Sequence, residues 1–503
     1  MKKRIRSTIA ALLALLTVAP LAACGSGDAG SAQTTTAAPI VKDTPAETTA
    51  PETVDDGLDA NGFLRDTLPE DLKLTQTEVS MLYWEDVEEP EFFVDGVNGE
   101  VINDAIYARN QAVEDRLGIK LSYIGQKGNA GNLKTFVAHV GNSIMTNDYA
   151  FDIIGGYSQT MANVAYNQYL LDLYNLEYFN FDMPWWPSLL TEEALVNGKL
   201  FFASGDISTN LLYKMYSNFF NKQLIKNYNL EDPYQLVKDG KWTLDKMFEM
   251  ATGVYKDLDG NGTKDKADQF GVIVANLDID TYFYGSGLRT TDKNEDGTIK
   301  ISDSYFGERS QELLEKLNRM IFVSEDGIYK GDAANAFAQG RALFYADRAV
   351  TAMKTFNVEG LEFGILPAPK WDEAQEEYYT CAGNPFTLYA LPINCRQPDQ
   401  MSAVLECLAS EGYRRTTPAI FETSMKVKYS QDEDSAQMYD IIRDAVTFDL
   451  GRVFGITMGD MTQTLYRNAV SSGNTVWSST SAAYKKMLGN YVKRVNEALL
   501  NAG

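Results

Sequence analysis

The chain of 503 residues is poor in the side chains that most often carry nucleophilic or metal chemistry, with 4 cysteines and 1 histidine. Cys381, Cys395 and Cys407 form no CxxC pair and show no metal-ligand spacing, which argues against a structural zinc site. A disulfide between Cys381 and Cys395 and buried free thiols both stay open. His139 lies in the apolar-periodic segment 133–140, which favours a packed or surface histidine. Unless His139 supplies the base, Ser-His-Asp and Cys-His mechanisms are excluded.

Basic residues are few relative to acidic ones. Lysine and arginine total 45 against 69 aspartates and glutamates, for a formal net charge of −24. Because phosphate binding needs clustered basic side chains, nucleic acid is not an expected partner. Beyond the N-terminal region no apolar run is long enough to cross a membrane. The content of 45% hydrophobic and 12% aromatic residues predicts folded domains with real cores.

The N-terminus carries an export signal. A basic start within residues 2–6 precedes the apolar run 9–21, and small residues lead directly to Cys24. This pattern resembles the lipobox of bacterial lipoproteins, in which the cysteine is acylated and becomes the new N-terminus. The alternative is an incidental cysteine after an ordinary signal peptide. We predict a signal peptide at 1–23 and a fatty acyl (palmitate) anchor on Cys24, which attaches the protein to the outer face of the cell membrane.

A flexible linker is predicted between the anchor and the folded body. Residues 24–74 contain this linker, most clearly up to about Gly57, where Thr, Pro, Ala, Ser and acidic residues dominate. Almost no large apolar side chain is available there to offset the entropy of ordering. The folded body is expected to begin near residue 75.

From residue 75 onward, apolar periodicity alternates between strands and helices. The clearest segments are strands at 78–84, 119–124, 152–157 and 198–203, a helix at 101–117 and a helix that begins after Thr243 as N-cap. In chain order, the strand 78–84, the helix 101–117 and the strand 119–124 form a strand–helix–strand unit, which predicts a parallel sheet and an α/β fold.

A series of short motifs continues along the chain in a fixed order. These are Asp152-Ile153-Ile154, Asn197 to Phe202, Phe219 to Leu224, Trp242 to Asp245, Ala336 to Phe344, Phe363 to Pro367 and Leu388 to Pro392. Their order and spacing resemble family 1 extracellular solute-binding proteins from about residue 77 to the C-terminus.

The resemblance implies a two-lobe, periplasmic-binding-protein-like α/β fold of type II, with hinge strands and a ligand cleft. If the layout is similar to that of maltose-binding proteins, lobe 1 comprises 75–212 and about 384–450, and lobe 2 comprises 213–383 and about 451–503. The resemblance also implies capture of an oligosaccharide or other small polar solute, delivered to the permease subunits of a membrane ABC importer. We expect a monomer.

Aromatic and polar side chains at inferred strand ends and cleft loops fit a carbohydrate site. Sugars offer C–H faces that stack on rings, and hydroxyls that bond to acids, amides and arginine. Any single ring could instead be ordinary core, Asp206 could cap a loop, and packing is favoured for Trp185 and Trp186. The predicted substrate-binding residues are Trp84, Glu85, Tyr157, Asp206, Tyr282, Tyr284, Tyr345, Arg348 and Asn384.

A calcium-loop pattern occupies residues 257–268. Oxygen ligands stand at loop positions 1, 3, 5, 9 and 12, Gly262 allows the sharp turn and the next residue offers its carbonyl. An aspartate replaces the usual glutamate at position 12, as in dockerin loops, and an acidic turn is the alternative. The predicted structural Ca²⁺ ligands are Asp257, Asp259, Asn261, Thr263, Asp265 and Asp268. A similar segment at 292–298 reads better as a β-hairpin turn.

Three classes of function are compared. A solute-binding lipoprotein accounts for the signal, the linker, the two-lobe pattern and the aromatic residues together. A surface glycan hydrolase needs two carboxylates about 5 to 9 Å apart, which the acidic composition does not exclude but no motif indicates. A non-transport glycan-binding or adhesion lipoprotein of dockerin type would need paired calcium loops in a short C-terminal unit. The prediction is therefore a binding protein and not an enzyme.

Overall fold

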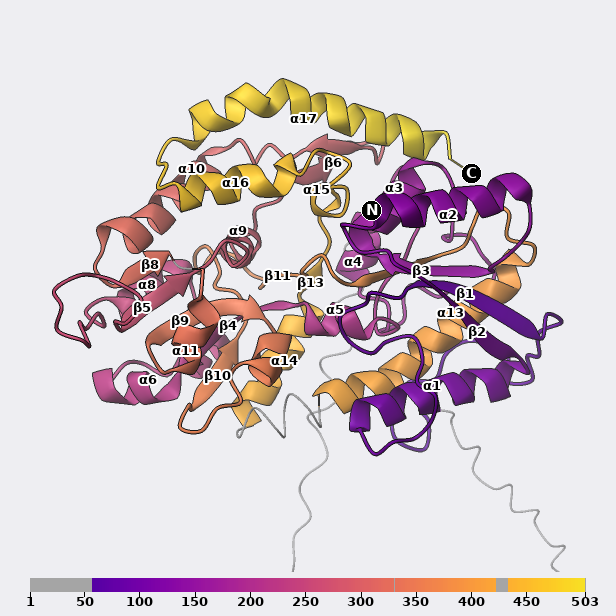
Figure 1. Cartoon of the computed structure of the whole chain (residues 1–503), viewed down its shortest axis with the longest axis horizontal. Helices are drawn as coiled ribbons and strands as arrows, with labels where there is room; N and C mark the ends of the chain where they lie inside the picture. Colours follow the sequence, from indigo (N-terminus) through magenta and orange to yellow (C-terminus); the bar gives the residue numbers. More distant parts are fainter. Residues whose placement is uncertain (1–56, 330, 422–432, 503) are drawn as a thin grey trace, which may run out of the picture. The chain divides into compact units, whose positions relative to one another are not determined.

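A computed structural model describes residues 57–329, 331–421 and 433–502. The predicted signal peptide, Cys24 and most of the predicted linker lie outside the described residues. The described chain is of mixed α/β class, as predicted, and its strands form two principal sheets (Figure 1).

The first sheet has four strands in the order β12-β3-β1-β2. These strands are β1 (Glu78–Trp84), β2 (Lys120–Gln126), β3 (Ile153–Tyr157) and β12 (Thr387–Ala390). β1 runs parallel to both β2 and β3, and β12 runs antiparallel to β3. The predicted strand–helix–strand start and its parallel pairing are confirmed, and the predicted strands lie within a residue or two of β1, β2 and β3.

Helices α1 (Val101–Leu117), α2 (Leu133–Thr146) and α3 (Ser158–Tyr166) belong to this part of the chain. α1 buries Ile106, Val113 and Leu117 on one face, as the apolar spacing predicts. It ends where Gly118 takes a φ of 68°, a conformation that glycine adopts without steric cost, and the Gly118 N–H bonds to the carbonyl of Glu114.

The second sheet has five strands in the order β10-β4-β9-β5-β8. They are β4 (Tyr216–Asn221), β5 (Phe270–Val274), β8 (Gly327–Tyr329), β9 (Ala342–Arg348) and β10 (Phe363–Leu366). β5 pairs in parallel with β8 and β9, whereas β4 runs antiparallel to β9 and β10. Strands β5, β8, β9 and β10 therefore end at the same edge of the sheet.

The other strands of the described residues form two short ladders. β11 (Thr380–Cys381) pairs in parallel with β13 (Val446–Thr447). β6 (Thr291–Lys293) and β7 (Ile299–Ile301) form an antiparallel hairpin. The hairpin confirms the preferred reading of the acidic segment 292–298.

The remaining helices cover the sheets and connect them. They are α4 (Ser188–Ala194), α5 (Thr209–Tyr213), α6 (Lys222–Tyr228), α7 (Pro233–Lys238), α8 (Leu244–Ala251), α9 (Ile279–Gly285), α10 (Glu308–Asn318), α11 (Ala333–Ala338), α12 (Val350–Lys354), α13 (Pro398–Glu411), α14 (Glu433–Asp444), α15 (Leu450–Val453), α16 (Met461–Ser471) and α17 (Trp477–Leu500), with π-helical turns at Arg319–Val323 and Gly412–Thr416. Thr243 caps α8 by accepting a hydrogen bond from the Lys246 N–H (3.2 Å), as predicted.

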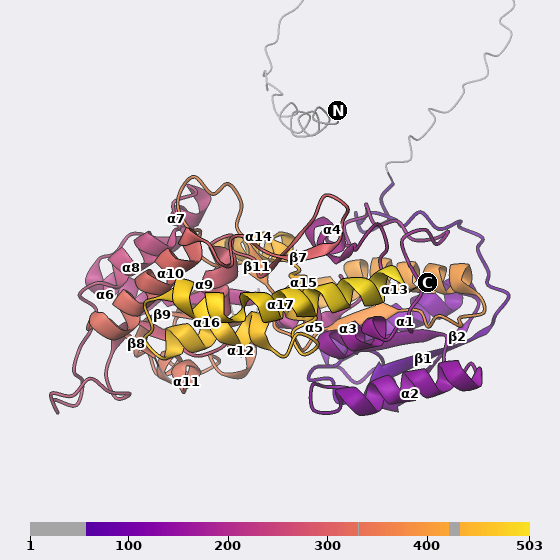
Figure 2. The same ribbon diagram turned by 90° about the horizontal axis from the view of Figure 1, so that it is seen from above.

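Within the described ranges 57–329, 331–421 and 433–502, the chain passes between the two sheets at the following places. It leaves the first part between α5 and β4, returns between β11 and β12, and passes again through β13 and α15. The C-terminal helix α17 runs alongside α16 (Figures 1 and 2) and contacts α3 of the first part as well as α10 and β7 of the second. The segment 451–503, predicted to belong to lobe 2, thus also touches lobe 1.

Three local predictions differ from the structure. The predicted strand 198–203 forms only isolated bridges, because Leu200 donates its N–H to the Asp172 side chain. The predicted aromatic loop around Tyr282 is the buried helix α9. The predicted linker ends before residue 74, since Leu74 is buried and its N–H bonds to the carbonyl of Leu117.

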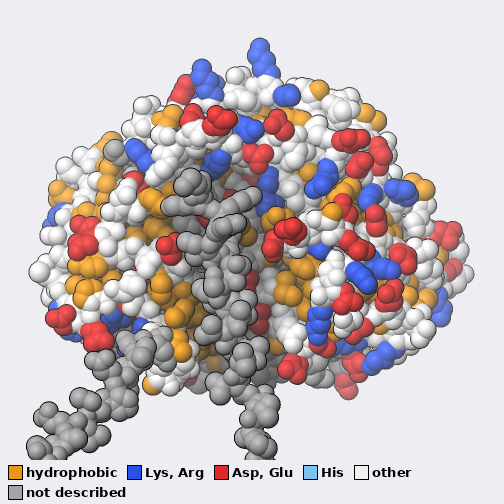
Figure 3. Space-filling view, turned by 180° about the vertical axis from the view of Figure 1, so that it is seen from behind, with side chains coloured by type: hydrophobic (Ala, Val, Ile, Leu, Met, Phe, Trp, Pro, Cys, Tyr) orange, Lys and Arg blue, Asp and Glu red, His pale blue; other side chains and the backbone are white. Residues whose placement is uncertain are grey.

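The surface and the cysteines complete the description. On the face drawn in Figure 3, acidic and basic side chains are interspersed. None of the described helices is both long and apolar enough to span a membrane. Cys381, Cys395 and Cys407 are free thiols, and the first and last of these are buried.

Candidate functional site

The carboxyl ends of the parallel strands indicate where a ligand would bind. β1 and β3 of the first sheet end at Trp84 and Tyr157, and β5 and β9 of the second end at Val274 and Arg348. Ligands of open α/β sheets bind just beyond such ends. The segments that follow these four strands therefore form the candidate site.

Ion pairs join the segment after β1 to the segment around the end of β9. Glu88 Oε2 lies 2.7 Å from Lys214 Nζ and 3.8 Å from Arg348 Nη1. Glu89 pairs with Lys354 and lies 3.7 Å from Lys214 Nζ. The Lys214 side chain, in the crossing before β4, is only 1% exposed. The carboxyl ends of the two sheets thus meet at this cluster.

Two carboxyl groups with little exposure lie at the ends of β5 and β9. Asp347 Oδ2 accepts a hydrogen bond from Tyr345 Oη (2.9 Å), and its Oδ1 accepts one from the Arg348 N–H (2.7 Å). Asp278, which follows β5, accepts one from the Ala275 N–H (2.8 Å). Burial raises the pKa of Asp278 well above its usual range, and the negative charge of Asp347 raises it further.

Two buried hydroxyl groups beside this pair have no hydrogen-bond partner in the part of the chain that the structure describes. Tyr282 Oη is one, and Tyr282 lies one turn after Asp278 on the same face of α9. Ser217 Oγ is the other, and Ser217 stands opposite Asp347 in the register of β4 and β9. A buried polar group without a partner costs about 1–3 kcal/mol, so a ligand that bonded to these hydroxyls would gain affinity.

The predicted residues of lobe 1 lie at strand ends but are mostly covered. Trp84 is 1% exposed, donates from Nε1 to Thr387 Oγ1 (2.9 Å) and packs 5.5 Å from the Tyr157 ring. Tyr157 Oη bonds to Gln159 Oε1 (3.1 Å), and burial raises the pKa of Tyr157. Glu85 is exposed. Direct contact of these residues with a ligand stays a prediction.

The predicted aromatic residues of lobe 2 are also buried. Tyr282 and Tyr284 lie on α9, where the Tyr284 ring centroid is 5.8 Å from the guanidinium carbon of Arg452. Tyr345 packs against Phe337, with ring centroids 6.0 Å apart. Their ring faces contact protein, so any ligand contact through these faces stays a prediction.

Three predicted polar residues have protein partners. Arg348 is partly exposed at the end of β9, beside Glu88. Asn384 is half-buried and donates from Nδ2 to Gln463 Oε1 (2.9 Å). Asp206 is buried and pairs with Arg443, with 2.6 Å between Nη2 and Oδ2, so its carboxylate is already engaged. The ligand roles of these residues are untested predictions.

Sequence reasoning missed the charged residues that bring the two sheets together. Glu88 and Glu89 closely follow the predicted strand end at Trp84, and Asp347 stands between two residues that were named. A search for charged side chains just beyond each predicted strand would have found Glu88 and Glu89, and a search beside the named residues would have found Asp347. Lys214 and Asp278 have no such signal, because only the tertiary fold places them in the cluster.

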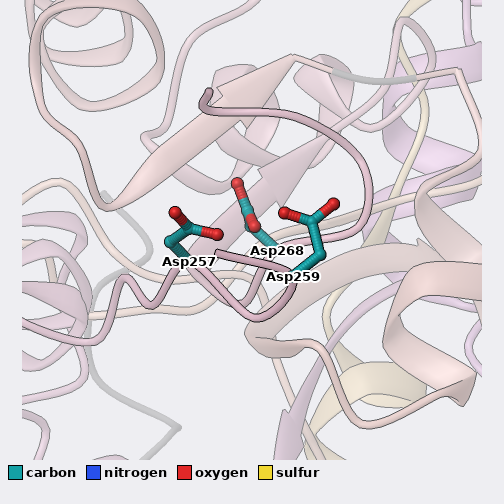
Figure 4. A group of neighbouring side chains, drawn as sticks. All are labelled: Asp257, Asp259 and Asp268. Carbon is teal, nitrogen blue, oxygen red and sulfur yellow. The ribbon is translucent and has the colours of Figure 1, made fainter. Parts of the chain in front are cut away.

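The predicted calcium ligands Asp257, Asp259 and Asp268 lie together on one loop (Figure 4). Their nearest carboxylate oxygens all lie within 4.8 Å of one another. Asp257 accepts hydrogen bonds from the N–H groups of Gly260 (2.7 Å) and Gly262 (2.8 Å), which bends the loop around its carboxylate and lowers the pKa of Asp257. This oxygen donor set is of the kind that Ca²⁺ prefers.

The described architecture matches solved structures over most of the chain. A cyclo/maltodextrin-binding protein complexed with maltotetraose is 12% identical, with a TM-score of 0.53, and the match covers 85% of this chain and 99% of that one. The cyclic alpha-maltosyl-1,6-maltose binding protein from Arthrobacter globiformis is 14% identical, with a TM-score of 0.53, and the match covers 85% and 100%.

This chain has the fold of those binding proteins. The two-lobe α/β prediction is thereby confirmed. The same binding-protein fold is found in the galacto-N-biose/lacto-N-biose I-binding protein of an ABC transporter from Bifidobacterium longum, in complex with lacto-N-biose. That protein is 11% identical, with a TM-score of 0.51, and the match covers 85% of this chain and 98% of that one. No protein-family model and no curated protein matches the sequence.

Proposed function

We propose that this chain is an extracellular solute-binding lipoprotein of an ABC importer, which captures an oligosaccharide and delivers it to a membrane permease. The observation that carries the proposal is the meeting of the carboxyl ends of the two sheets at Glu88 and Arg348. This meeting occurs in a fold shared with proteins that are named for the sugars they bind.

The chemistry of the candidate site supports binding of a hydroxylated solute. Carboxylates accept hydrogen bonds from sugar hydroxyls, whereas the guanidinium of Arg348 donates to ring and hydroxyl oxygens. The sole histidine, His139, lies on α2 with its ring 6.0 Å from that of Phe151. We therefore propose that the chain binds its ligand without covalent chemistry. We also propose that it acts as a monomer.

Calorimetry across neutral oligosaccharides tests the proposal. At least one glycan should bind, and Arg348→Ala should weaken it by about 1.5–3 kcal/mol, because a hydrogen bond to a charged donor is lost. Lys226→Ala removes a cation from an exposed ion pair with Glu362 and should leave the affinity unchanged. X-ray scattering should show compaction at saturation if the lobes close on the ligand.

Two results would contradict this proposal. The first is an absence of binding across the panel. The second is release of reducing ends at a rate that a single carboxylate substitution abolishes, which would favour a glycan hydrolase.

Membrane attachment through Cys24 is the second part of the proposal, supported by the sequence pattern at residues 1–24. The mature protein should fractionate with membranes, and Cys24→Ser should release it into the soluble fraction because stable anchoring needs acyl chains. Cys407→Ser, at a buried thiol, serves as the control for loss of a cysteine. Undiminished membrane retention of Cys24→Ser would rule out the lipid anchor.

A structural Ca²⁺ ion at the 257–268 loop is the third part, supported by the clustering of Asp257, Asp259 and Asp268. Free Ca²⁺ at 100 times its Kd should stabilise the fold by about 2.7 kcal/mol, which a rise in Tm on adding Ca²⁺ to chelator-treated protein detects. Asp257→Ala should remove that rise, whereas Glu295→Ala, in the exposed hairpin turn, should keep it. A Tm that is the same with Ca²⁺ and with chelator would mean that the segment is an acidic turn that binds no Ca²⁺.

A further inference from the structure

The carboxyl groups of Asp278 and Asp347 lie at neighbouring strand ends of the second sheet. β5 pairs in parallel with β9, with Ile273 opposite Tyr345, so the two strands end side by side. Asp347 is the next-to-last residue of β9, and Asp278 caps the turn after β5 through the Ala275 N–H. The general acidity of the chain does not explain this pair, because surplus acidic residues normally lie on the exposed surface.

Asp278 lacks a cation among the residues that the structure describes. Asp278 is 3% exposed, and the negative charges of Asp347 and Asp280 both oppose its ionisation. The positive charge of Arg348 acts to lower the pKa of Asp278, but burial and the charges of Asp347 and Asp280 outweigh it. Arg348 instead lies 3.7 Å from Asp347 and 3.8 Å from Glu88, and its buried Nε has no hydrogen-bond partner among the described residues.

Phenol and hydroxyl groups surround the carboxyl pair. Tyr345 Oη already bonds to Asp347, whereas the unpartnered Tyr282 Oη and Ser217 Oγ are fully buried on the flanking α9 and β4. These oxygens accept hydrogen bonds as well as donate them. The charge of Asp347 raises the pKa of the buried Asp278 carboxyl group. Such a pair of like charges favours a cation between them, because the cation offsets both their mutual repulsion and their desolvation.

We propose that Asp278 and Asp347 form a subsite for a positively charged amine on the captured solute, so that the ligand is an amino sugar. This inference rests on the proposed function, of which it specifies the substrate class. The ammonium group would donate to Asp278 and to the neighbouring oxygens, while the rest of the sugar contacts the cluster around Glu88 and Arg348.

Three trisaccharides that differ only at carbon 2 test the inference by calorimetry at slightly acid pH. The β-1,4-linked glucosamine trimer carries charged amines, the N-acetylglucosamine trimer carries neutral amides, and cellotriose carries hydroxyls. The glucosamine trimer should bind about tenfold more tightly than either neutral form, which corresponds to about 1.4 kcal/mol.

Single substitutions locate the preference. Asp278→Asn and Asp347→Asn should each lower the affinity for the glucosamine trimer about tenfold more than the affinity for cellotriose, which removes the advantage of the trimer. Glu373→Gln removes the same charge from an exposed position and should keep the advantage. A melting temperature no lower than that of the wild type shows that the variants fold, which is expected because an amide relieves the repulsion between the two carboxylates.

The outcomes separate this inference from the proposed function. Binding of a neutral oligosaccharide with no preference for the glucosamine trimer overturns the amine subsite and leaves the solute-binding role standing. A preference that survives both Asp278→Asn and Asp347→Asn overturns the assignment to these carboxylates. Absence of binding to every neutral and amino glycan overturns both proposals.

Discussion

Replacing Asp280 by alanine is expected to lower the free energy of unfolding by about 3–5 kcal/mol, because it leaves two buried arginines without their counter-ion. Asp280 Oδ1 lies 2.7 Å from Arg467 Nε, and Oδ2 bonds to both Arg467 Nη2 and Arg452 Nη1. All three residues are less than 10% exposed. Burial acts to raise the pKa of Asp280, but the two guanidinium groups outweigh it and hold the pKa below its usual value.

The position of this ion triad explains the size of the expected effect. Asp280 lies on α9, Arg467 on α16 and Arg452 on α15, so the triad fixes three helices. Arg452 Nε also donates to the carbonyl of Ala382 (2.9 Å), and Gln159 Nε2 of α3 donates to the carbonyl of Arg452 (3.1 Å). Loss of Asp280 therefore weakens the junction between the two parts of the chain.

Denaturant unfolding of matched variants measures this effect. Asp280→Asn keeps the size and one acceptor oxygen and should destabilise less than Asp280→Ala. Asp303→Ala removes an exposed partner of Lys300 and should change stability little, since exposed ion pairs contribute little. Equal unfolding midpoints for Asp280→Ala and Asp303→Ala would show that the buried triad does not stabilise the fold.

Local sequence patterns predicted the elements that depend on local interactions. Strand β1 and helix α1 follow from apolar periodicity alone, and both bounds agree with the structure. The tight turn between β6 and β7 also follows from its own residues, because glycine after aspartate allows the backbone to reverse. These predictions hold because neighbours along the chain decide the conformation.

Burial of strand-end residues depends on distant chain segments and was therefore missed. Trp84 was correctly placed at the end of β1, but its indole bonds to Thr387, 303 residues further along the chain. The sequence predicts Tyr282 in a loop near the cleft, whereas it lies in helix α9, in which every residue is buried. Asp278 and Asp347 lie at neighbouring strand ends only because β5 and β9 pair in parallel. No periodicity in the sequence encodes such a long-range pairing.

Trp185 and Trp186 are a second case in which the sequence does not reveal a distant partner. The sequence favours a packing role for this adjacent pair, and the burial of both rings confirms it. The acceptor was not foreseen: Glu406 of α13 receives the Trp185 indole N–H on Oε1 (2.9 Å) and the Trp186 indole N–H on Oε2 (2.8 Å). One buried carboxylate thus satisfies two adjacent indoles more than 200 residues away in the chain.

Stability should fall between about pH 4.5 and pH 7 because of this carboxyl group. Burial raises the pKa of Glu406 to about 7 and outweighs the three N–H donors, from Trp186, Asn180 and Trp185, that lower it. The folded state then binds more protons than the unfolded state, whose glutamate titrates near 4.5. The contribution of Glu406 to stability is therefore complete below pH 4.5 and is lost as the pH rises through 7. The pKa difference corresponds to about 3 kcal/mol.

The difference in unfolding free energy between the wild type and Glu406→Gln isolates this effect from all other titrating groups. The amide oxygen can accept from one indole, but the amide N–H₂ leaves the other indole without an acceptor, so the variant is expected to be less stable at pH 4.5. That deficit should shrink by about 3 kcal/mol as the pH rises to 7, because the wild type alone loses the contribution of the protonated carboxyl. Glu373→Gln, at an exposed position, provides the matched loss of a surface carboxylate. A difference between wild type and Glu406→Gln that stays constant across this range would mean that Glu406 ionises with the same pKa in the folded and unfolded chains, so that its three N–H donors cancel the cost of its burial.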